Sequence, residues 1–210
     1  MINKLRILIV EDEPAIAEHI AAYLDNDDFE VSSIAYDSED ALDQLKNNTP
    51  DAVILDINLE GSTDGIDIAQ FINDTCQIPF LFLTAHSDKQ TLNRAKTVNP
   101  SGYIVKPFNE KTLQASMEIA IANHSKQLNS QAPKLLPQKL NSLLDDPFSD
   151  RELDVLQLVY EGATNKQIAQ QLFISENTVK THIKNIYIKL DAGTRYGALV
   201  RLRELMAKKT

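Results

Sequence analysis

The sequence has little cysteine and no long apolar runs. Its 210 residues include one cysteine, Cys76, which excludes a disulfide within the chain and any metal site built from several cysteines. No segment approaches the roughly 18 consecutive apolar residues that a membrane span requires. Residues 1–10 form too short an apolar run for a secretory signal and contain no small-residue cleavage site. These absences predict a cytoplasmic protein that does not interact with membranes.

Charge is distributed unevenly along the chain, whose formal net charge is −9. Residues 1–124 contain 8 basic and 21 acidic residues, whereas residues 125–210 contain 13 and 9. Within 164–210 the counts are 9 basic and 3 acidic. This asymmetry indicates two parts with separate functions, and the basic end is the natural candidate for binding a polyanion. A solvated basic surface would explain the same counts equally well.

The first 124 residues alternate between short apolar runs and segments with apolar residues at helical spacing. Several runs are almost continuously apolar, which is typical of parallel strands buried on both faces. Between them, residues such as Ile16, Ile20 and Leu24 recur with a helical period. Strands alternating with helices of about 10–15 residues predict an α/β fold with a doubly wound, five-stranded parallel sheet. The expected strands are Leu5–Val10, Phe29–Ile34, Ala52–Leu55, Pro79–Thr84 and Gly102–Val105.

Residues 125–147 differ in composition from the segments on both sides. Three prolines, several amide side chains and a broken periodicity predict a linker. A group of leucines indicates that part of this linker can form a short helix that docks on one of the two domains. The pattern leaves open which domain it is. The leucines are Leu135, Leu136, Leu140, Leu143 and Leu144.

The segment 148–210 has the pattern of a small, all-α domain of four helices. The expected N-caps, in chain order, are Ser149, Thr164, Ser175 and Thr194. Glu152 and Gln167 follow the first two caps by three residues, which is the spacing of a capping box. Gly162 is expected to end the first helix.

Polar side chains lie at the carboxyl ends of four expected strands, where ligands bind in an open parallel sheet. They are Glu11 and Asp12 after the first strand, Asp56 after the third, Thr84 at the end of the fourth and Lys106 after the fifth. Crowded carboxylates repel each other unless a divalent cation neutralises them. Oxygen ligands that share a cation with phosphate suit Mg²⁺.

These residue types also predict a chemistry. A carboxylate can attack phosphorus and form an acyl phosphate, while Mg²⁺ and a lysine neutralise the oxygens of the transferred group. Asp56 is the best nucleophile because it stands alone after a central strand. Taken singly, Asp56 and Thr84 could instead be helix caps and Lys106 a solvated lysine. Their placement at one sheet edge favours a joint function.

Four segments resemble the signature segments of response-regulator receiver domains, in the same order across residues 1–124. These segments are VEDEP, VILDINLEGSTDGID, FLFLTAHS and GYIVKPF. The resemblance implies the flavodoxin-like receiver fold, with Asp56 as phosphoacceptor. It also implies a Mg²⁺ site formed by Asp12 and Asp56, by Glu11 through water, and by the backbone carbonyl of Asn58.

The same resemblance implies a switch. Thr84 would hydrogen-bond the phosphoryl group and Lys106 would pair with it. Tyr103 is similar to the aromatic residue that turns inward when the threonine moves toward the phosphate. The Lys106–Pro107 bond resembles the family's cis peptide, which would aim the lysine.

Two features depart from the family pattern. Glu11 stands where aspartate is more usual, which should matter little for a contact made through water. The loop after Asp56 reads INLEGSTDG, without the usual proline and one residue longer. Because this loop shapes access to the site, the lifetime of the phosphoryl group is the property it most affects.

The basic end contains the elements of a helix-turn-helix, in which the second helix enters the DNA major groove. The segment 148–190 resembles the NarL/LuxR-type helix-turn-helix, and the resemblance covers roughly 146–208. It implies major-groove contacts by Lys180, Thr181 and Lys184, phosphate contacts by Asn165, Lys166 and Thr178, and a fourth helix that contributes to a dimer on DNA. An amphipathic surface helix with ordinary lysines is the alternative. The segment after Leu190 is unusual, because the family commonly has glycine near Asp191.

Together these segments predict a transcription regulator rather than an enzyme. A histidine kinase would phosphorylate Asp56 with Mg²⁺, and this would switch DNA binding and homodimerisation of the C-terminal domain. A phosphorylation-independent regulator, whose receiver is only a dimerisation module, is the closest alternative. A phosphatase of the haloacid-dehalogenase type is less favoured, because such enzymes need a second aspartate where this chain has Asn58. The kinase, the operator and the sign of regulation do not follow from the sequence.

Overall fold

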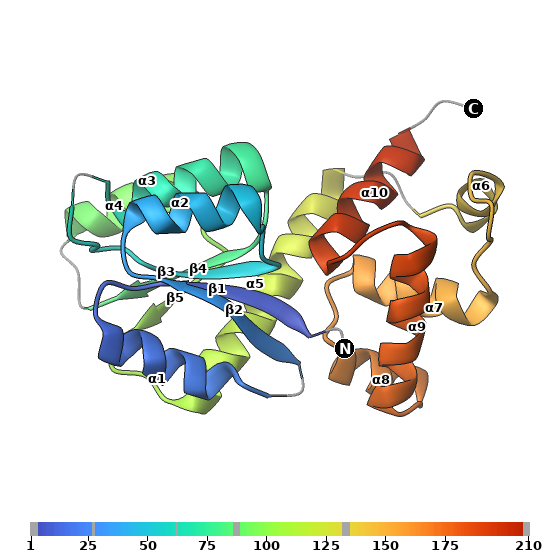
Figure 1. Ribbon diagram of the computed structural model, residues 1–210, viewed down its shortest axis with the longest axis horizontal. Coiled ribbons are helices and arrows are strands. Elements are labelled where there is room, and N and C mark those ends of the chain that lie inside the picture. Colours follow the sequence, from blue (N-terminus) through green and yellow to red (C-terminus); the bar gives the residue numbers. More distant parts are fainter. Residues whose placement is uncertain (1–3, 27, 62, 86–88, 132–134, 208–210) are drawn as a thin grey trace. The chain divides into compact units, whose positions relative to one another are not determined.

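The computed structural model describes residues 4–26, 28–61, 63–85, 89–131 and 135–207. The chain divides into two compact units, one of residues Lys4–Ile121 and one from Ala122 onward. Figure 1 shows a sheet covered by helices in the first unit and only helices in the second. No described helix combines the length and hydropathy needed to cross a bilayer.

The first unit contains one five-stranded parallel sheet in the order β2-β1-β3-β4-β5. This confirms the predicted sheet, with some strand ends shifted by a residue. The strands are β1 (Leu5–Val10), β2 (Phe29–Ala35), β3 (Ala52–Asp56), β4 (Phe80–Thr84) and β5 (Gly102–Val105). The chain order reverses between β1 and β3, which is where ligands bind in this topology.

Helices cover both faces of the sheet because its central strands are apolar on both. Figure 1 shows α2, α3 and α4 on one face and α1 and α5 on the other. Alternate residues such as Ile7, Ile54 and Leu83 pack against α1 and α5, and their neighbours Leu8 and Phe82 are buried on the opposite face. The helical segments are α1 (Pro14–Leu24), α2 (Ser38–Asn47), α3 (Gly65–Phe71), the π-helical turn η1 (Ile72–Cys76), α4 (Lys89–Thr97) and α5 (Glu110–Gln131).

The second unit is helical, and its caps match the predicted ones. Its helices are α6 (Pro137–Ser142), α7 (Asp150–Tyr160), α8 (Asn165–Leu172), α9 (Glu176–Lys189) and α10 (Arg195–Ala207). Capping boxes open α7 and α8, Ser175 caps α9, and the Thr194 hydroxyl accepts from Gly197 N–H at 3.0 Å near the start of α10. Gly162 follows α7 with a positive φ of 87°. These interactions satisfy backbone groups that a helix end leaves unpaired.

Helix α6 shows on which domain the leucine-bearing linker docks. Its Leu140 is fully buried in the core of the second unit, among residues of α7, α9 and α10. The Lys139 ammonium donates to the carbonyl of Met206 in α10 at 2.9 Å. The end of the expected linker is therefore packed on the helical C-terminal unit, while residues 132–134 lie outside the described part of the chain.

Candidate functional site

Four strand ends bring the predicted site residues to one edge of the sheet. Asp56 is the last residue of β3 and pairs in register with Leu83 of β4, while Thr84 pairs with Val105 of β5. Glu11 follows β1 directly, and Lys106 follows β5, where its N–H donates to the Thr84 carbonyl at 2.8 Å. The Lys106–Pro107 peptide is cis, as predicted.

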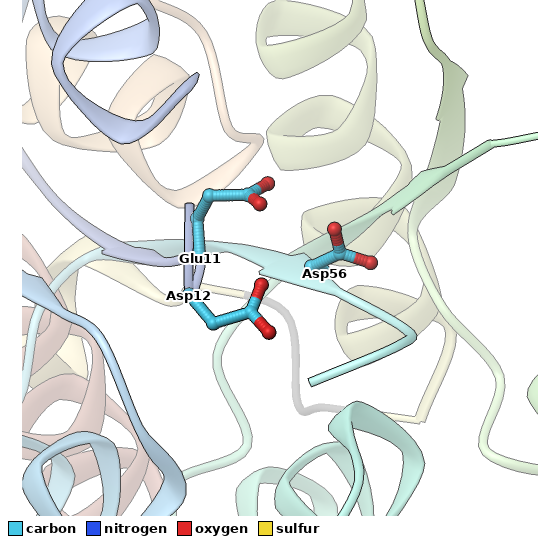
Figure 2. A group of neighbouring side chains, drawn as sticks. All are labelled: Glu11, Asp12 and Asp56. Carbon is cyan, nitrogen blue, oxygen red and sulfur yellow. The ribbon is translucent and has the colours of Figure 1, made fainter. Parts of the chain in front are cut away.

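Three carboxylates form an acidic cluster at this edge. One oxygen from each of Glu11, Asp12 and Asp56 lies within 4.8 Å of the others, and Figure 2 shows the three groups gathered around a common space. Glu11 and Asp56 are buried, and Asp12 is half-buried. Since carboxylates at this spacing repel each other, the cluster favours a bound cation or proton.

Lys106 supplies the positive charge beside this cluster. Its ammonium donates to Glu11 Oε2 at 2.7 Å and to Asp56 Oδ2 at 2.5 Å. Burial lowers the pKa of Lys106, but the hydrogen bonds and charges of Asp56 and Glu11 outweigh it, so the net direction is upward. The lysine is therefore held cationic, within reach of any group attached to the Asp56 carboxylate.

Glu11 is the member of the cluster with an unpartnered carboxylate oxygen. Its side chain is fully buried, and among the described residues its Oε1 atom has no hydrogen-bond partner. Burial, reinforced by the charge of Asp56, raises its pKa from 4.5 to about 7, against the lowering effect of Lys106. A buried acceptor without a donor is costly, so this oxygen favours a bound proton or cation.

These residues fit a Mg²⁺ ion. Magnesium prefers oxygen ligands, uses one or two carboxylates and keeps several waters. The orphaned Glu11 Oε1 and the half-exposed Asp12 provide such oxygens next to Asp56. Asn58 is exposed, and its backbone N–H donates to Asp56 Oδ1 at 2.9 Å. The ligand role predicted for its carbonyl stays a prediction.

The two predicted switch residues occupy different environments. Thr84 is buried at the site edge, and its hydroxyl donates to the Ala85 carbonyl at 3.0 Å. Tyr103 is 37% exposed, and its ring centroid lies 5.9 Å from that of Phe82. Partial burial raises the pKa of Tyr103. The tyrosine thus lies outward, on the sheet face covered by α4.

Sequence reasoning missed the residues that support the loop after Asp56. Gly65 starts α3 so close to Asp56 that a Cβ atom there would clash with the Asp56 carbonyl oxygen. Asp64 forms a capping box with Asp67 at the start of the same helix and pairs with Arg94 of α4 at 2.8 Å. The adjacent Asp64 and Gly65 were the available signal, because this dipeptide marks turns.

The loop itself is tied to the metal-ligand candidates. The backbone N–H of Glu60 donates to Asp12 Oδ2 at 3.0 Å. Gly61 has a φ of 138°, in the region that favours glycine. Residue 62 lies outside the described residues, so the predicted extra length of the loop is described only in part.

The candidate DNA-binding residues lie on α8 and α9. The side chains of Lys166, Thr178, Thr181 and Lys184 are exposed, and that of Lys180 is half-buried. Asn165 is 5% exposed, which argues against a side-chain contact with a phosphate. The Ser175 hydroxyl accepts from Thr178 N–H at 3.1 Å and caps α9. The N-terminus of α9 therefore presents oriented amide groups of the kind that bind phosphate.

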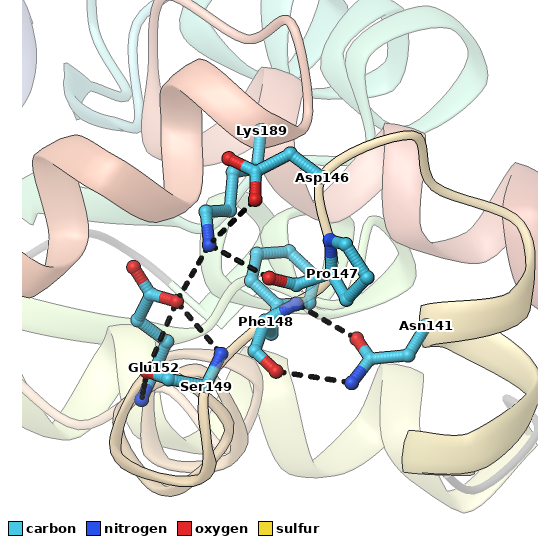
Figure 3. Close-up of polar contacts among 7 residues, drawn as sticks. All are labelled: Asn141, Asp146, Pro147, Phe148, Ser149, Glu152 and Lys189. Atoms are coloured by element: carbon cyan, nitrogen blue, oxygen red, sulfur yellow. Dashed lines mark hydrogen bonds and ion pairs between the residues drawn. The ribbon is translucent and has the colours of Figure 1, made fainter.

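A polar network fixes the other end of α9 (Figure 3). The Lys189 ammonium donates to the Pro147 carbonyl at 2.8 Å and to Glu152 Oε2 at 2.9 Å, and lies 3.4 Å from Asp146 Oδ1. Burial raises the pKa of Glu152, but hydrogen bonds from Ser149 and Lys189 outweigh it, so the net direction is downward. The segment before α7 is thus attached directly to α9.

Comparison with known families gives a match for each unit. The model described as "Response regulator receiver domain" matches residues 7–118. The model described as "Bacterial regulatory proteins, luxR family" matches residues 146–202.

Relatives match over nearly the whole chain. A nitrate/nitrite response regulator protein homolog of Haemophilus influenzae is 32% identical over 205 residues, which are 95% of this chain and 97% of the relative. The transcriptional regulatory protein DesR of Bacillus subtilis is 32% identical, with the same two coverages.

Solved structures agree with these matches. The signal receiver domain of a modulated diguanylate cyclase from Desulfovibrio desulfuricans G20 has a TM-score of 0.55 and 34% identity over 60% of this chain and 99% of that one. Full-length FixJ from B. japonicum has a TM-score of 0.51 over 99% of this chain and 100% of that one, at 22% identity, which shows a shared fold.

Proposed function

The chain belongs to the response regulators that join a receiver domain to a LuxR-type DNA-binding domain, and from this premise we propose that phosphorylation of Asp56 controls its binding to DNA. Members of this family are transcription regulators rather than enzymes. A receiver implies a cognate histidine kinase, and the helix-turn-helix implies binding to double-stranded DNA. The observation that carries the proposal is the convergence of Asp56, the carboxylates of Glu11 and Asp12, and the Lys106 ammonium.

The phosphoryl transfer uses these groups in distinct roles. An oxygen of the Asp56 carboxylate attacks phosphorus, the Oδ–P bond forms, and the bond from phosphorus to the kinase histidine breaks. Asp12, Asp56 and the Asn58 carbonyl, with Glu11 acting through water, would hold Mg²⁺, which would supply positive charge to neutralise the transferred group. The Lys106 ammonium, already at 2.5 Å from Asp56, pairs with a phosphoryl oxygen after transfer.

The switch then passes from the site to the second domain. The Thr84 hydroxyl donates to the Ala85 carbonyl at 3.0 Å, and a phosphoryl oxygen on Asp56 would be a stronger, charged acceptor. Redirecting Thr84 toward it vacates space that Tyr103 fills from its half-exposed position. The altered surface near α4, β5 and α5 biases the equilibrium toward a homodimer competent to bind DNA.

Binding to DNA uses the exposed residues of α8 and α9. Lys180, Thr181 and Lys184 face the major groove, and Lys166 and Thr178 contact phosphates. Of the predicted contacts, only Asn165 has a buried side chain, so we assign it no side-chain contact with DNA. We propose residues 1–124 as the receiver domain and residues 148–210 as the DNA-binding domain, with α6 of the intervening segment 125–147 packed on the latter.

Phosphorylation with a small phosphodonor tests the site. In the presence of Mg²⁺, the wild-type chain should form an acid-stable, base-labile acyl phosphate, and Asp56→Asn should form none. Asp43→Asn, at an exposed position of α2, is the matched control and should be labelled like the wild type. Retention of label in Asp56→Asn would overturn the assignment, and turnover of added phosphate esters would instead support a phosphatase.

A further inference from the structure

One exposed face of helix α9 extends beyond the residues that are proposed to contact DNA. We call it the exposed stripe. A helix turns by about 100° per residue, which places Asn177, Thr181, Lys184 and Ile188 within an arc of about 60°. All four side chains are exposed. The opposite face carries the buried Val179, Ile183, Ile186 and Leu190. Thr181 and Lys184, two of the residues proposed to read DNA, thus share one face of the helix with Ile188.

Ile188 is the apolar member of this stripe. Its side chain is 68% exposed, one of the highest values among the large hydrophobic residues of the described chain. It lies one turn after Lys184 and outside the hydrophobic core of its unit. A large apolar side chain that stays in water forgoes the free energy gained by burying it. This exposure is compatible with a function in which the side chain is covered by a ligand.

Thr181, two turns before Ile188 on the same stripe, also presents an apolar group. Its hydroxyl donates to the Asn177 carbonyl at 2.9 Å, within the helix. The hydroxyl hydrogen is therefore already used, which leaves the methyl group and the acceptor lone pairs of the oxygen to contact a ligand. The stripe combines two apolar groups with the cation of Lys184, in a segment whose basic residues suit a polyanion.

We propose that Ile188 is a specificity-determining residue that contacts the C5-methyl group of a thymine in the major groove. The inference rests on the proposed binding of α9 to DNA. The thymine methyl is the apolar group that base pairs display in this groove, while Lys184 suits the O6 and N7 atoms of guanine. Ile188 lies about 6 Å further along the helix axis than Lys184, so the preferred thymine should lie close to the guanine read by Lys184.

Selection from a random-sequence duplex pool tests this even though the operator is unidentified. The full chain, activated with beryllofluoride and Mg²⁺, should enrich a motif that contains a thymine at a position where Ile188→Ala shows no preference. Replacing that thymine by deoxyuridine should weaken wild-type binding about 3–5-fold, the effect of one buried methyl group, and leave Ile188→Ala unchanged. Leu136→Ala, which truncates another exposed apolar side chain, outside α8 and α9, should behave as the wild type.

The outcomes separate this inference from the proposed function. If the wild type enriches no motif, DNA recognition itself fails and the role of Ile188 with it. If the wild type and Ile188→Ala enrich the same motif and respond equally to deoxyuridine, only the role of Ile188 is overturned. Ile188→Lys provides a second check. A gain in affinity for all sequences, with a steeper salt dependence, would place the position against the phosphate backbone and contradict a base contact.

Discussion

Replacing Glu11 by glutamine should remove most of the pH dependence of the stability of the metal-free receiver. The carboxyl group of Glu11 is fully buried, with one oxygen unpartnered, and its pKa is raised from 4.5 to about 7. The folded state therefore holds a proton that the unfolded chain releases. This contribution is complete below pH 4.5 and is lost as the pH rises through about 7.

The size of the effect follows from that change in pKa. Because the pKa of Glu11 rises from 4.5 to about 7 on folding, the free energy of unfolding should fall by about 3 kcal/mol between pH 4.5 and pH 8. For a unit of the size of Lys4–Ile121, this is about 10 °C in the unfolding midpoint. Mg²⁺ should restore most of the loss at pH 8, because it favours the ionised form of Glu11.

Calorimetry of the full chain in a chelator at pH 5 and pH 8 measures this directly. The receiver transition of the wild type should fall by about 10 °C relative to Glu11→Gln. Glu13→Gln removes a charge from an exposed neighbour and should keep the wild-type pH dependence. An equal fall in the wild type and Glu11→Gln would show that the burial of Glu11 is not its cause.

Three further substitutions test local features. Gly65→Ala should destabilise the receiver by about 1–3 kcal/mol and impair phosphorylation, because the added Cβ meets the Asp56 carbonyl. Chemical denaturation measures the first effect, and labelling with a small phosphodonor measures the second. Asn141→Ala should destabilise the C-terminal unit by about 2 kcal/mol without changing the receiver transition, since it removes two hydrogen bonds to the Phe148 backbone (Figure 3). Asp191→Gly should raise the unfolding midpoint of the C-terminal unit, because Asp191 has a left-handed φ of 51° that glycine adopts more readily. The expected gain is about 1 kcal/mol. An unchanged midpoint would show that aspartate adopts this conformation without cost.

Much of the fold was predictable because its signals are local. The nearly continuous apolar runs identified β1, β3 and β4, and the spacing of Ser149 and Glu152 identified the start of α7. The continuation of α5 to Gln131 was not predicted, since the apolar periodicity weakens after Ile121. The docking of α6 depends on contacts of Leu140 with residues far away in the sequence, which no local pattern encodes.

The acidic cluster was predictable for a different reason. Parallel strands bring their carboxyl ends to one edge, so Asp56 and Lys106 had to lie near Glu11 once the strands were identified. The pairing of Asp64 with Arg94 and the close approach of Gly65 depend on the path of the loop. Because the loop after Asp56 departs from the family pattern, no local sequence rule predicts its path.

DNA binding with and without a phosphate mimic tests the central claim most directly. With Mg²⁺ present, beryllofluoride should increase the affinity of the wild type for a selected duplex by about 5–150-fold, the usual range of coupling between two sites. Asp56→Asn should bind with the same affinity in both conditions. Equal wild-type affinity with and without beryllofluoride, despite acyl-phosphate formation at Asp56, would contradict phosphorylation control and favour a receiver that serves only in dimerisation.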